Sequence, residues 1–454
     1  MMQLPASLIS ELALMPDFDV QAFVAAHELL APTSVRLHPV KHSKRFVEAE
    51  AVKWCEQGRY LKTRPIFTLD PLFHAGAYYV QEASSMLLQY FIEKLFDKNI
   101  ALKALDLCAA PGGKSTLLAS SLPQDSLLIS NEVIRSRAGI LEENLNRWGY
   151  MHTWVCSNDA KDLGKLHGYF DVVVADAPCS GSGLFRKDIK ALDEWSDANV
   201  ELCSQRQQRI LADIWPALKE NGVLIYSTCS YSYKEDEAIL DWLIADFDAE
   251  SIALDMPESW GVLESRSKKG AFGYRLFPHQ VAGEGFFIAA LRKKQASHSM
   301  QAIKDKYKED PKIKAHAGNF LDMVDKTIIP KDKDAYSVIF NRHLSDWLFL
   351  KDKVYFRKTG VGIGSPVQQD WIPHHELALS IYLNKEVPKI EVLLDDALRY
   401  LKKEDAPFPE MSKGWYYVCY EGLGLGWVKN IGKRYNNYLP KESRIRMDIR
   451  ETDW

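Results

Sequence analysis

Short apolar runs, rich in β-branched and aromatic residues, alternate with helical segments between Ala104 and Arg292. The runs read ALDLC, SLLISNE, MHTWVC, FDVVVADAP and GVLIYSTC, and the later ones are almost continuously apolar. Intervening stretches such as RSRAGILEENLNRWG have the length and periodicity of helices. Strands at this spacing, with helices between them, form βαβ units around a buried parallel sheet. We therefore expect an α/β domain in the middle of the chain.

The segments on either side of this sheet predict further domains. Residues 1–75 mix helix and strand signals and are expected to form an α+β cap, followed by the sheet domain over 76–293. Residues 294–318 are polar and poor in apolar side chains, which predicts a linker. The rest is rich in short aromatic strands, and we divide it into an intermediate α+β domain, 319–405, and a terminal barrel-like module, 406–454.

Composition excludes several classes of protein. With 46% hydrophobic and 26% charged residues the chain is typical of globular proteins, and no apolar run approaches the roughly 18 residues that span a bilayer. The seven cysteines, an odd number spread over a long chain, argue against a disulfide framework, and the absence of a CxxC pair among them argues against a zinc site. We expect a cytoplasmic protein without a metal, and nothing requires more than a monomer. The segment from Met411 to Arg450 has roughly eight basic residues against three acidic ones, which suits a polyanionic partner or simply a solvated surface.

The stretch LDLCAAPGGKSTLLA, at the end of the first of these strands, is close to a phosphate-binding loop but departs from it. Such a loop requires the pattern G-x-x-x-x-G-K-[ST], and the position of its first glycine is Cys108 here, which disfavours a nucleotide hydrolase. Small residues ahead of a helix N-terminus still let a ligand carboxylate approach the backbone. The next strand ends at Glu132, which is suited to a ribose diol. The pattern fits a nucleoside cofactor without phosphates, such as S-adenosylmethionine. A structural turn followed by a surface glutamate is the alternative interpretation of the same residues.

Two later strands end in cysteine motifs. VVVADAPCSGSG delivers Asp176 and Cys179 at one strand end, and VLIYSTCS delivers Thr228 and Cys229 at the next. Parallel strands carry their carboxyl ends to the same edge of a sheet, so both thiols are expected beside the cofactor turn. Either cysteine alone would suit a buried small apolar residue. Together, without metal-ligand partners, they indicate covalent catalysis.

Several stretches, quoted together, resemble one family. DLCAAPGGKS, DAPCSGSG, STCSYSYKEDE and RLFPHQVAGEGFFIAALRK, with YVQEASSM ahead of the sheet, resemble the Sun/RsmF family of RNA cytosine-5 methyltransferases. The stretch SKGWYYVCYEGLGLGWVKNIGKRYNNYLPKESRIR resembles the PUA-like RNA-binding module that ends RsmF-type members. The resemblance implies a Rossmann-like class I methyltransferase sheet, S-adenosylmethionine as cofactor and RNA as partner. One departure is His38, where family members often carry asparagine.

The resemblance also implies catalytic roles. Cys229, in the Thr-Cys motif, would be the nucleophile, and Cys179, in the Pro-Cys motif, would help to release the product. DNA cytosine-5 methyltransferases offer the alternative, with the nucleophile in Pro-Cys, but they have no second cysteine in the Thr-Cys position. Asp176 would hydrogen-bond the cytosine edge near N3 and N4, and Lys114 would support the same polar network.

Cofactor and RNA contacts follow in the same way. The expected cofactor-binding residues are Cys108, Ala109, Ala110, Pro111, Gly112, Gly113, Lys114, Glu132, Arg137, Asp159 and Asp176. Asp159 would meet the adenine amine, although it and Arg137 are also suited to a helix cap and an ion pair. The expected RNA contacts include Arg186 and Lys187, for which a solvated loop is the competing interpretation. They also include Lys429, Lys433 and Arg434, for which a packed barrel with a charged rim is the competing interpretation. The N-terminal cap, residues 1–75, is also expected to contact RNA.

The sequence therefore predicts an RNA cytosine-5 methyltransferase. The extended RsmF-like tail favours small-subunit (16S) ribosomal RNA as the substrate. Transfer RNA is the competing substrate. A ribosome-assembly RNA-binding protein without turnover is an alternative from another class, and the intact cysteines and cofactor turn argue against it.

Overall fold

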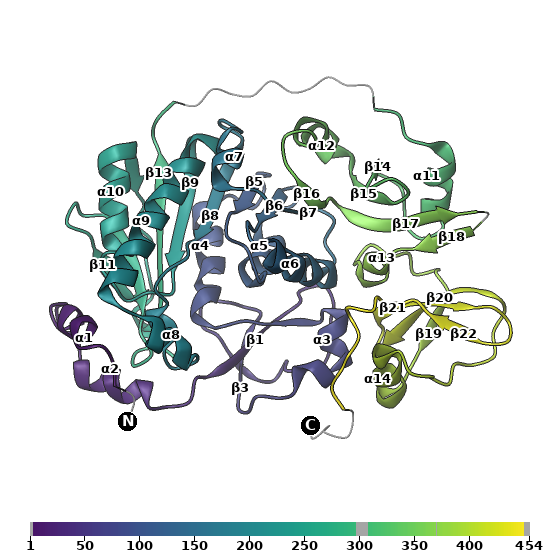
Figure 1. Cartoon of the computed structure of the whole chain (residues 1–454), viewed down its shortest axis with the longest axis horizontal. Coiled ribbons are helices and arrows are strands. Elements are labelled where there is room, and N and C mark those ends of the chain that lie inside the picture. Colours follow the sequence, from purple (N-terminus) through teal and green to yellow (C-terminus); the bar gives the residue numbers. More distant parts are fainter. Residues whose placement is uncertain (1–2, 297–306, 369, 449–454) are drawn as a thin grey trace.

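The computed structural model describes residues 3–296, 307–368 and 370–448 and is built around a ten-stranded mixed sheet (Figure 1). The strand order is β11-β12-β13-β9-β8-β5-β6-β7-β16, with β10 paired to β13 outside this path. The strands are β5 (Lys103–Asp106), β6 (Leu127–Asn131), β7 (Thr153–Cys156), β8 (Phe170–Asp176), β9 (Leu218–Thr228), β10 (Ala249–Ser251), β11 (Leu263–Arg266), β12 (Phe272–Leu276), β13 (Phe286–Lys293) and β16 (Phe356–Lys358). β5 to β9 are parallel to one another, and β13 runs antiparallel beside β9. The predicted α/β sheet is confirmed.

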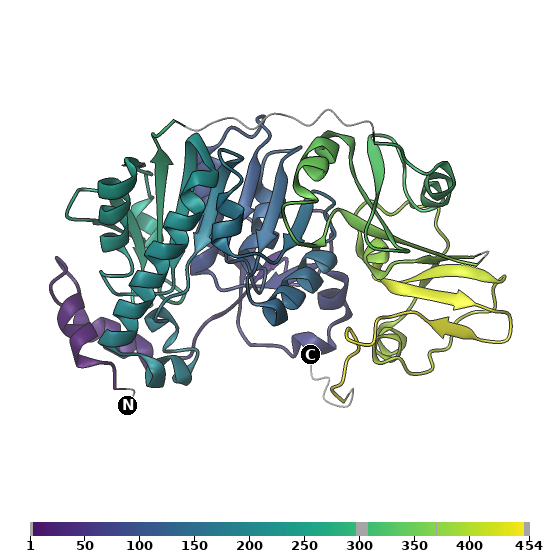
Figure 2. The same ribbon diagram turned by 45° about the horizontal axis from the view of Figure 1, so that its top comes forward.

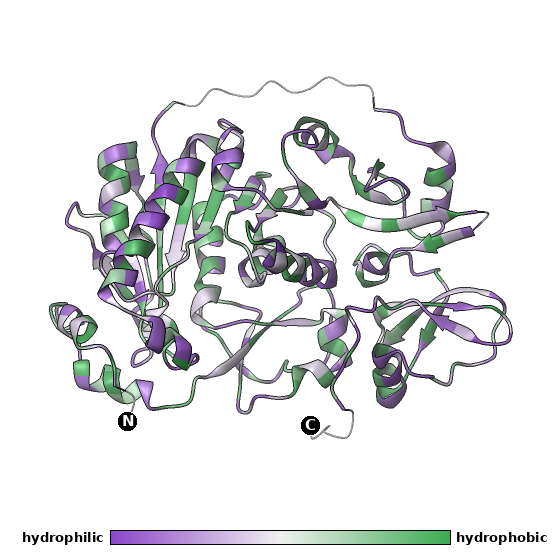
Figure 3. Ribbon diagram, in the orientation of Figure 1, coloured by the Kyte–Doolittle hydropathy of each residue, from purple (hydrophilic) through white to green (hydrophobic). Residues whose placement is uncertain are grey.

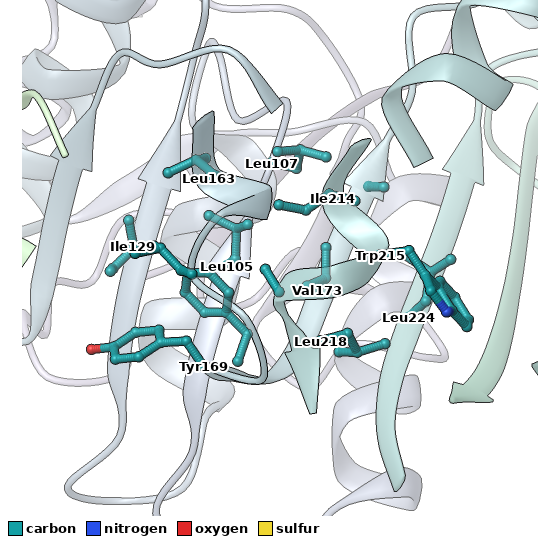
Figure 4. Close-up of a cluster of buried hydrophobic side chains, with 14 of the residues drawn as sticks. Leu105, Leu107, Ile129, Leu163, Tyr169, Val173, Ile214, Trp215, Leu218 and Leu224 are labelled. Carbon is teal, nitrogen blue, oxygen red and sulfur yellow. The ribbon is translucent and has the colours of Figure 1, made fainter. Parts of the chain in front are cut away.

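Helices cover both faces of this sheet. They are α4 (Leu88–Leu95), α5 (Gly113–Ser121), α6 (Arg135–Trp148), α7 (Ala160–Gly164), α9 (Asp197–Ile214) and α10 (Glu237–Phe247). α8 (Ile189–Glu194) packs instead on the apolar cluster that contains Leu8 and Phe23. On one face Leu163 of α7 and Ile214 of α9 pack on Leu105 and Val173 of the strands (Figure 4). On the other face α4 and α5 cover the strands. The ribbon of the central strands is coloured mainly as hydrophobic, whereas α9 alternates hydrophobic and hydrophilic residues (Figure 3), as expected of a helix with one buried side.

The N-terminal cap is larger than its predicted range of 1–75. It contains helices α1 (Ala6–Leu12), α2 (Val20–His27) and α3 (Pro71–Ala75), and a four-stranded sheet β2-β3-β1-β4 of Glu50–Ala51, Gly58–Leu61, Thr33–Leu37 and Tyr78–Val80. Since β4 pairs with β1, Val35 opposite Val80, the cap continues through Val80. His38, the residue at which the sequence departs from the family, has a structural role. Its buried ring contacts the carbonyl of Trp148 at 2.9 Å and accepts hydrogen bonds from two backbone N–H groups of its own loop.

The C-terminal region forms two small units whose predicted boundaries require correction. The first holds α11 (Pro311–Gly318), α12 (Leu344–Leu350), α13 (His375–Leu379) and the sheet β14-β15-β17-β18 of Lys326–Pro330, Tyr336–Phe340, Val361–Val367 and Asp370–Pro373. α11 falls within the predicted linker 294–318 but belongs to this unit, because its Ile313 and Ala317 are buried in the core of the unit. Residues 297–306 of the predicted linker lie outside the described residues.

The terminal unit begins earlier than the predicted residue 406. Its strands β19 (Lys389–Glu391), β20 (Gly414–Tyr420), β21 (Leu423–Asn430) and β22 (Tyr435–Asn437) form one sheet that packs on α14 (Leu394–Lys402). β19 pairs in parallel with β20 and belongs with it, so the predicted intermediate domain ends before Lys389. Figures 1 and 2 show both units beside the edge of the large sheet that ends in β7 and β16. Among the described helices, none is long and apolar enough to cross a membrane.

Candidate active site

The two predicted catalytic cysteines are in contact. Cys179 follows β8 and Cys229 follows β9, two adjacent parallel strands, so both side chains emerge at the carboxyl edge of the sheet. Their Sγ atoms lie 3.0 Å apart, both thiols are free, and both residues are partly exposed. The arrangement provides two sulfur atoms at one point of a partly open surface.

The buried carboxylate of Glu235 holds the two cysteine loops together. It accepts hydrogen bonds from the Ser180 backbone N–H at 2.7 Å and from the Ser180 hydroxyl at 2.5 Å, next to Cys179. It also accepts one from the Ser230 hydroxyl at 2.6 Å, next to Cys229. One side chain therefore fixes the residues that adjoin both thiols. Our sequence analysis missed this role, although Glu235 lies in the quoted stretch STCSYSYKEDE.

A second buried cluster supports the same loops. Asp236 accepts a hydrogen bond from the Thr228 hydroxyl at 2.6 Å, immediately before Cys229. The guanidinium of Arg275, on β12, lies 3.0 Å from Asp236 and 2.5 Å from Glu237. Buried charges of this kind are stable only when paired. The cluster anchors the end of β9 against β12 and so positions the Cys229 loop.

The environment gives Cys179 a defined protonation state. Its pKa is raised well above the ordinary thiol value, first by its hydrogen bond to Cys229, then by burial and by the charges of Cys229 and Glu235. Cys179 therefore stays a neutral thiol that can donate a hydrogen bond to its neighbour. A thiol in this state is a poor nucleophile, because the thiolate is the reactive form.

Lys114 and Asp176 form an ion pair beside the thiols. The Lys114 Nζ lies 2.9 Å from the Asp176 Oδ2, and the Ser227 hydroxyl donates to Oδ1 at 2.8 Å. Burial alone would lower the pKa of Lys114, but the charge and hydrogen bond of Asp176, together with other negative charge nearby such as that of Asp106, outweigh burial and the pKa is raised. The lysine is therefore a cation at neutral pH. About a third of the Asp176 side chain remains exposed (34%), so the carboxylate is accessible to a ligand.

The predicted cofactor turn, Cys108 to Lys114, joins β5 to α5 at the same edge. Its Ala110–Pro111 peptide is cis, and Gly112 has a φ of 116°. Neighbours hold the turn through its carbonyl groups: the Asn144 amide donates to Pro111 at 2.7 Å, and Arg137 donates to Ala110 at 2.8 Å. The backbone of the turn is therefore fixed from α6.

We expect Gly112→Ala to destabilise the protein by about 1–3 kcal/mol, because φ is positive there. A Cβ atom at this position would also lie 3.3 Å from side-chain atoms of Asn144 and Leu141. Urea unfolding measures the change. Gly139→Ala is the control, since a Cβ there meets only the end of Arg357 at 3.8 Å and alanine favours a helix interior. Equal stability of the Gly112→Ala and Gly139→Ala variants would show that the backbone at Gly112 does not require glycine.

Asp106 offers an unused acceptor behind this turn. The Ser115 hydroxyl donates to its Oδ2 at 2.6 Å, while its buried Oδ1 has no partner among the described residues. Burial raises the pKa of Asp106 to about 7, partly offset by Ser115 and Lys114. A buried acceptor without a donor is costly, which suits a site completed by a cationic ligand. This observation fits the ammonium and sulfonium groups of S-adenosylmethionine.

Glu132 and Arg137 lie on the other side of the turn. Glu132, just past β6, is buried, accepts a hydrogen bond from the Ile134 N–H at 2.9 Å and lies 3.7 Å from the Arg137 guanidinium. Arg137 therefore forms an ion pair with Glu132, which was the alternative interpretation of this residue in the sequence analysis. It bridges Glu132 and the Ala110 carbonyl, which brings the two predicted cofactor-binding segments together.

A small pocket of about 100 Å³ extends past Glu132, and its lining includes Cys108, Asn131, Asn158, Asp159 and Arg209. Asp159 caps α7 by accepting from the Lys161 N–H at 3.0 Å and also faces this pocket. Asn131 was missed by the sequence analysis. Its amide donates to the Leu107 carbonyl at 3.1 Å and the Asn158 carbonyl at 3.0 Å, so it ties the ends of β5, β6 and β7 together. Its place at the end of the strand SLLISNE was the available signal.

The predicted RNA contacts are not all at the surface. The Arg186 side chain is only 5% exposed, pairs with Glu284 at 3.0 Å and donates to the Gly283 carbonyl at 2.6 Å. The predicted phosphate contact at Arg186 is therefore wrong, because this side chain forms an internal ion pair. Lys429 forms an ion pair with Asp370. The remaining three predicted contacts are exposed: Lys187, Lys433 and Arg434. Within the described ranges, no group of three or more His, Cys, Asp or Glu side chains is arranged to hold a metal ion.

A parallel sheet with a final antiparallel strand and a small-residue turn after its first strand defines a Rossmann-like methyltransferase that uses S-adenosylmethionine. A crystal structure of a methyltransferase homologue from Pyrococcus horikoshii agrees, with a TM-score of 0.51 and 27% identity over 64% of this chain and 100% of that one. A second structure, described as NSun6 from the same organism with SFG, has a TM-score of 0.54 and 19% identity over 64% of this chain and 98% of that one, and supports the fold.

Three family descriptions match successive parts of the chain. They are the N-terminal domain of 16S rRNA methyltransferase RsmF (4–83), 16S rRNA methyltransferase RsmB/F (96–292) and the methyltransferase RsmF PUA domain (387–445). Ribosomal RNA small subunit methyltransferase F of Shewanella loihica is 32% identical over 87% of this chain and 83% of its own length. That of Shewanella oneidensis is 29% identical over 97% of both chains. The chain belongs to the RsmF family of S-adenosylmethionine-dependent 16S rRNA methyltransferases.

Proposed function

We propose that this chain methylates C5 of a cytosine in 16S rRNA through a covalent bond between Cys229 and the base. The contact of the Cys179 and Cys229 sulfur atoms at 3.0 Å, beside the Lys114–Asp176 pair, carries the proposal. C5 of cytosine is a weak nucleophile. Addition of a thiolate to C6 converts the ring into an enamine whose C5 can react, and this is nucleophilic catalysis.

Cys229 is the nucleophile in this proposal because Cys179 is held as a neutral thiol. Its sulfur forms a bond to C6, and the ring gains negative charge towards N3. Asp176, with its exposed carboxylate, accepts a hydrogen bond from the exocyclic amine, and the Lys114 cation offsets the charge on the ring. Once C5 carries the methyl group as well as its proton, loss of that proton to water re-forms the C5–C6 double bond, breaks the C6–sulfur bond and returns the electron pair of that bond to Cys229.

When bound, S-adenosylmethionine supplies the electrophilic methyl group that C5 accepts. The turn from Cys108 to Lys114 would hold its methionine part, with the free oxygen of Asp106 as an acceptor for the cation. Glu132 would hold the ribose diol. The pocket at Asn158 and Asp159 would receive the adenine ring, with Asp159 accepting from its amine.

The target base must leave its stack to reach this edge, which single-stranded or opened RNA permits at the lowest cost. Lys187, close in the chain to Cys179, and Lys433 and Arg434 in the terminal unit are exposed cations suited to RNA phosphates. Phosphate contacts position RNA without reading its sequence, so the choice of cytosine depends on the shape of the RNA and on the base pocket.

Bisulfite sequencing tests the proposal. Total RNA is compared between cells with the gene, cells without it, and deletion cells that carry the Cys229→Ala variant. We expect one or more cytosines of 16S rRNA to lose protection in the deletion strain and to stay unprotected with the variant. Loss of protection in transfer RNA would overturn the substrate. Unchanged protection throughout would leave a ribosome-assembly RNA-binding protein as the function.

The pKa of Asp106 leads to a pH prediction. A raised carboxyl pKa of about 7 means that the free site loses its proton as the pH rises from 6 to 8, and only the ionised form attracts a cation. We expect S-adenosylmethionine to bind up to about tenfold more tightly at pH 8 than at pH 6, as measured by calorimetry. Asp106→Asn serves as the control and should lose this part of the pH dependence. The same pH profile in both proteins would refute the role of Asp106.

A further inference from the structure

A cavity of about 580 Å³ lies between the cap and α6. Its lining includes Arg64 and Phe73 from the cap, Tyr79 from β4, and Asn144 and Arg147 from α6, and it contains no acidic residue. A second cavity of about 680 Å³ continues along the cap and shares Arg64 and Pro65 with the first. We call the first cavity the cap pocket.

The cap pocket combines guanidinium groups with aromatic rings. Arg147 lies over the Phe73 ring, 4.5 Å from its centre, and Arg64 lies 5.4 Å from the centre of the Phe67 ring. The Arg147 Nε is buried without a partner among the described residues, and the nearest carboxylate, Glu143, is 3.9 Å away and half exposed. No ion pair involves Arg64 in the described part of the chain. Positive charge therefore exceeds the negative charge close to this pocket.

The pocket adjoins the active site through single residues. The Asn144 amide donates to the Pro111 carbonyl of the cofactor turn at 2.7 Å. The Tyr79 ring would lie 3.5 Å from a Cβ atom at Gly113, the residue before Lys114. Residues that line the cap pocket therefore contact the cofactor turn, which ends at Lys114, the partner of Asp176.

We propose that the cap pocket binds one nucleotide of the RNA, adjacent in the strand to the target cytosine or a few nucleotides away. Arg64 and Arg147 contact its phosphate, and its base stacks on Phe73 or Tyr79. Guanidinium groups next to aromatic faces are the surface that unpaired nucleotides bind, since every base has a stacking face. This inference rests on the proposed function, because it assumes that RNA is the substrate.

Arg64→Ala tests the pocket with little risk to folding, because the side chain is exposed. The substrates are deproteinised 16S rRNA and small ribosomal subunits from a deletion strain, and methyl transfer is followed from labelled S-adenosylmethionine. We expect KM for RNA to rise about tenfold with kcat unchanged, and the dependence of log KM on log salt to fall by about 0.7, the value for one phosphate contact on a single strand. Arg266→Ala, an exposed arginine on β11 at the far end of the sheet, is the matched control and should behave as the wild type.

Photocrosslinking provides the second measurement. RNA that contains 4-thiouridine is irradiated with the wild-type protein, and we expect cross-linked peptides to include Phe73 or Tyr79. Cross-links that lie only in other parts of the chain, or a wild-type KM and salt dependence for Arg64→Ala, would overturn the cap pocket while leaving the proposed function intact. A wild-type protein that methylates neither substrate would overturn the proposed function instead.

Discussion

Replacement of Cys229 by alanine is expected to reduce methyl transfer to RNA by at least about 10⁴-fold, a loss typical of removing a covalent nucleophile. Without the sulfur atom no enamine forms, and C5 keeps the weak reactivity of free cytosine. The fold should survive, because Cys229 is partly exposed and its loop is held by Thr228 and Ser230 rather than by its own side chain. Incorporation of labelled methyl groups into 16S rRNA measures the effect.

Two controls separate this loss from indirect causes. Calorimetry should give the Cys229→Ala variant the wild-type affinity for S-adenosylmethionine. Cys55→Ala, which removes a buried thiol that donates a hydrogen bond to Gln89 at 3.0 Å, should keep wild-type turnover. Retained activity in Cys229→Ala together with an inactive Cys179→Ala would transfer the nucleophile to the Pro-Cys motif.

The central sheet was predictable because each of its parallel strands is a nearly continuous apolar run followed by a helix. The edge strand β16 was not predictable. Its three residues, FRK, carry no periodicity, yet Phe356 pairs with Cys156, two hundred residues earlier in the chain. The Arg357 guanidinium adds an ion pair to Glu142 of α6 at 2.9 Å. Pairings of this kind join residues that are far apart in the chain, and local sequence does not encode them.

The candidate site divides in the same way. Strand order brings Asp176, Cys179 and Cys229 to one edge, and the sequence predicted that. Whether a charged side chain faces solvent or the interior is decided by distant partners. Arg186 lies beside an exposed Lys187, but Glu284, almost a hundred residues later, holds it inside. The hydrogen bonds by which Glu235 holds both cysteine loops were likewise not predictable from the sequence, because its partners follow two different strands.

Replacement of Cys179 by alanine is expected to trap the protein on its RNA. In the last step of the proposed reaction, Cys229 would leave C6 as a thiolate, and the neutral Cys179 thiol, 3.0 Å from Cys229, would donate a hydrogen bond to it. A hydrogen bond to a charged group contributes about 1.5–3 kcal/mol, so its loss should slow release by roughly 10- to 100-fold.

The covalent complex should then accumulate and appear as a band that survives denaturing electrophoresis with labelled 16S rRNA. The double variant Cys179→Ala/Cys229→Ala lacks the sulfur that forms the bond and should give no such band. Absence of the complex in Cys179→Ala, with turnover close to wild type, would show that departure of Cys229 does not depend on its neighbour. A complex in the double variant would place the covalent bond on another residue. Because the single variants remove the two sulfur atoms of one contact one at a time, they assign nucleophile and releasing group separately.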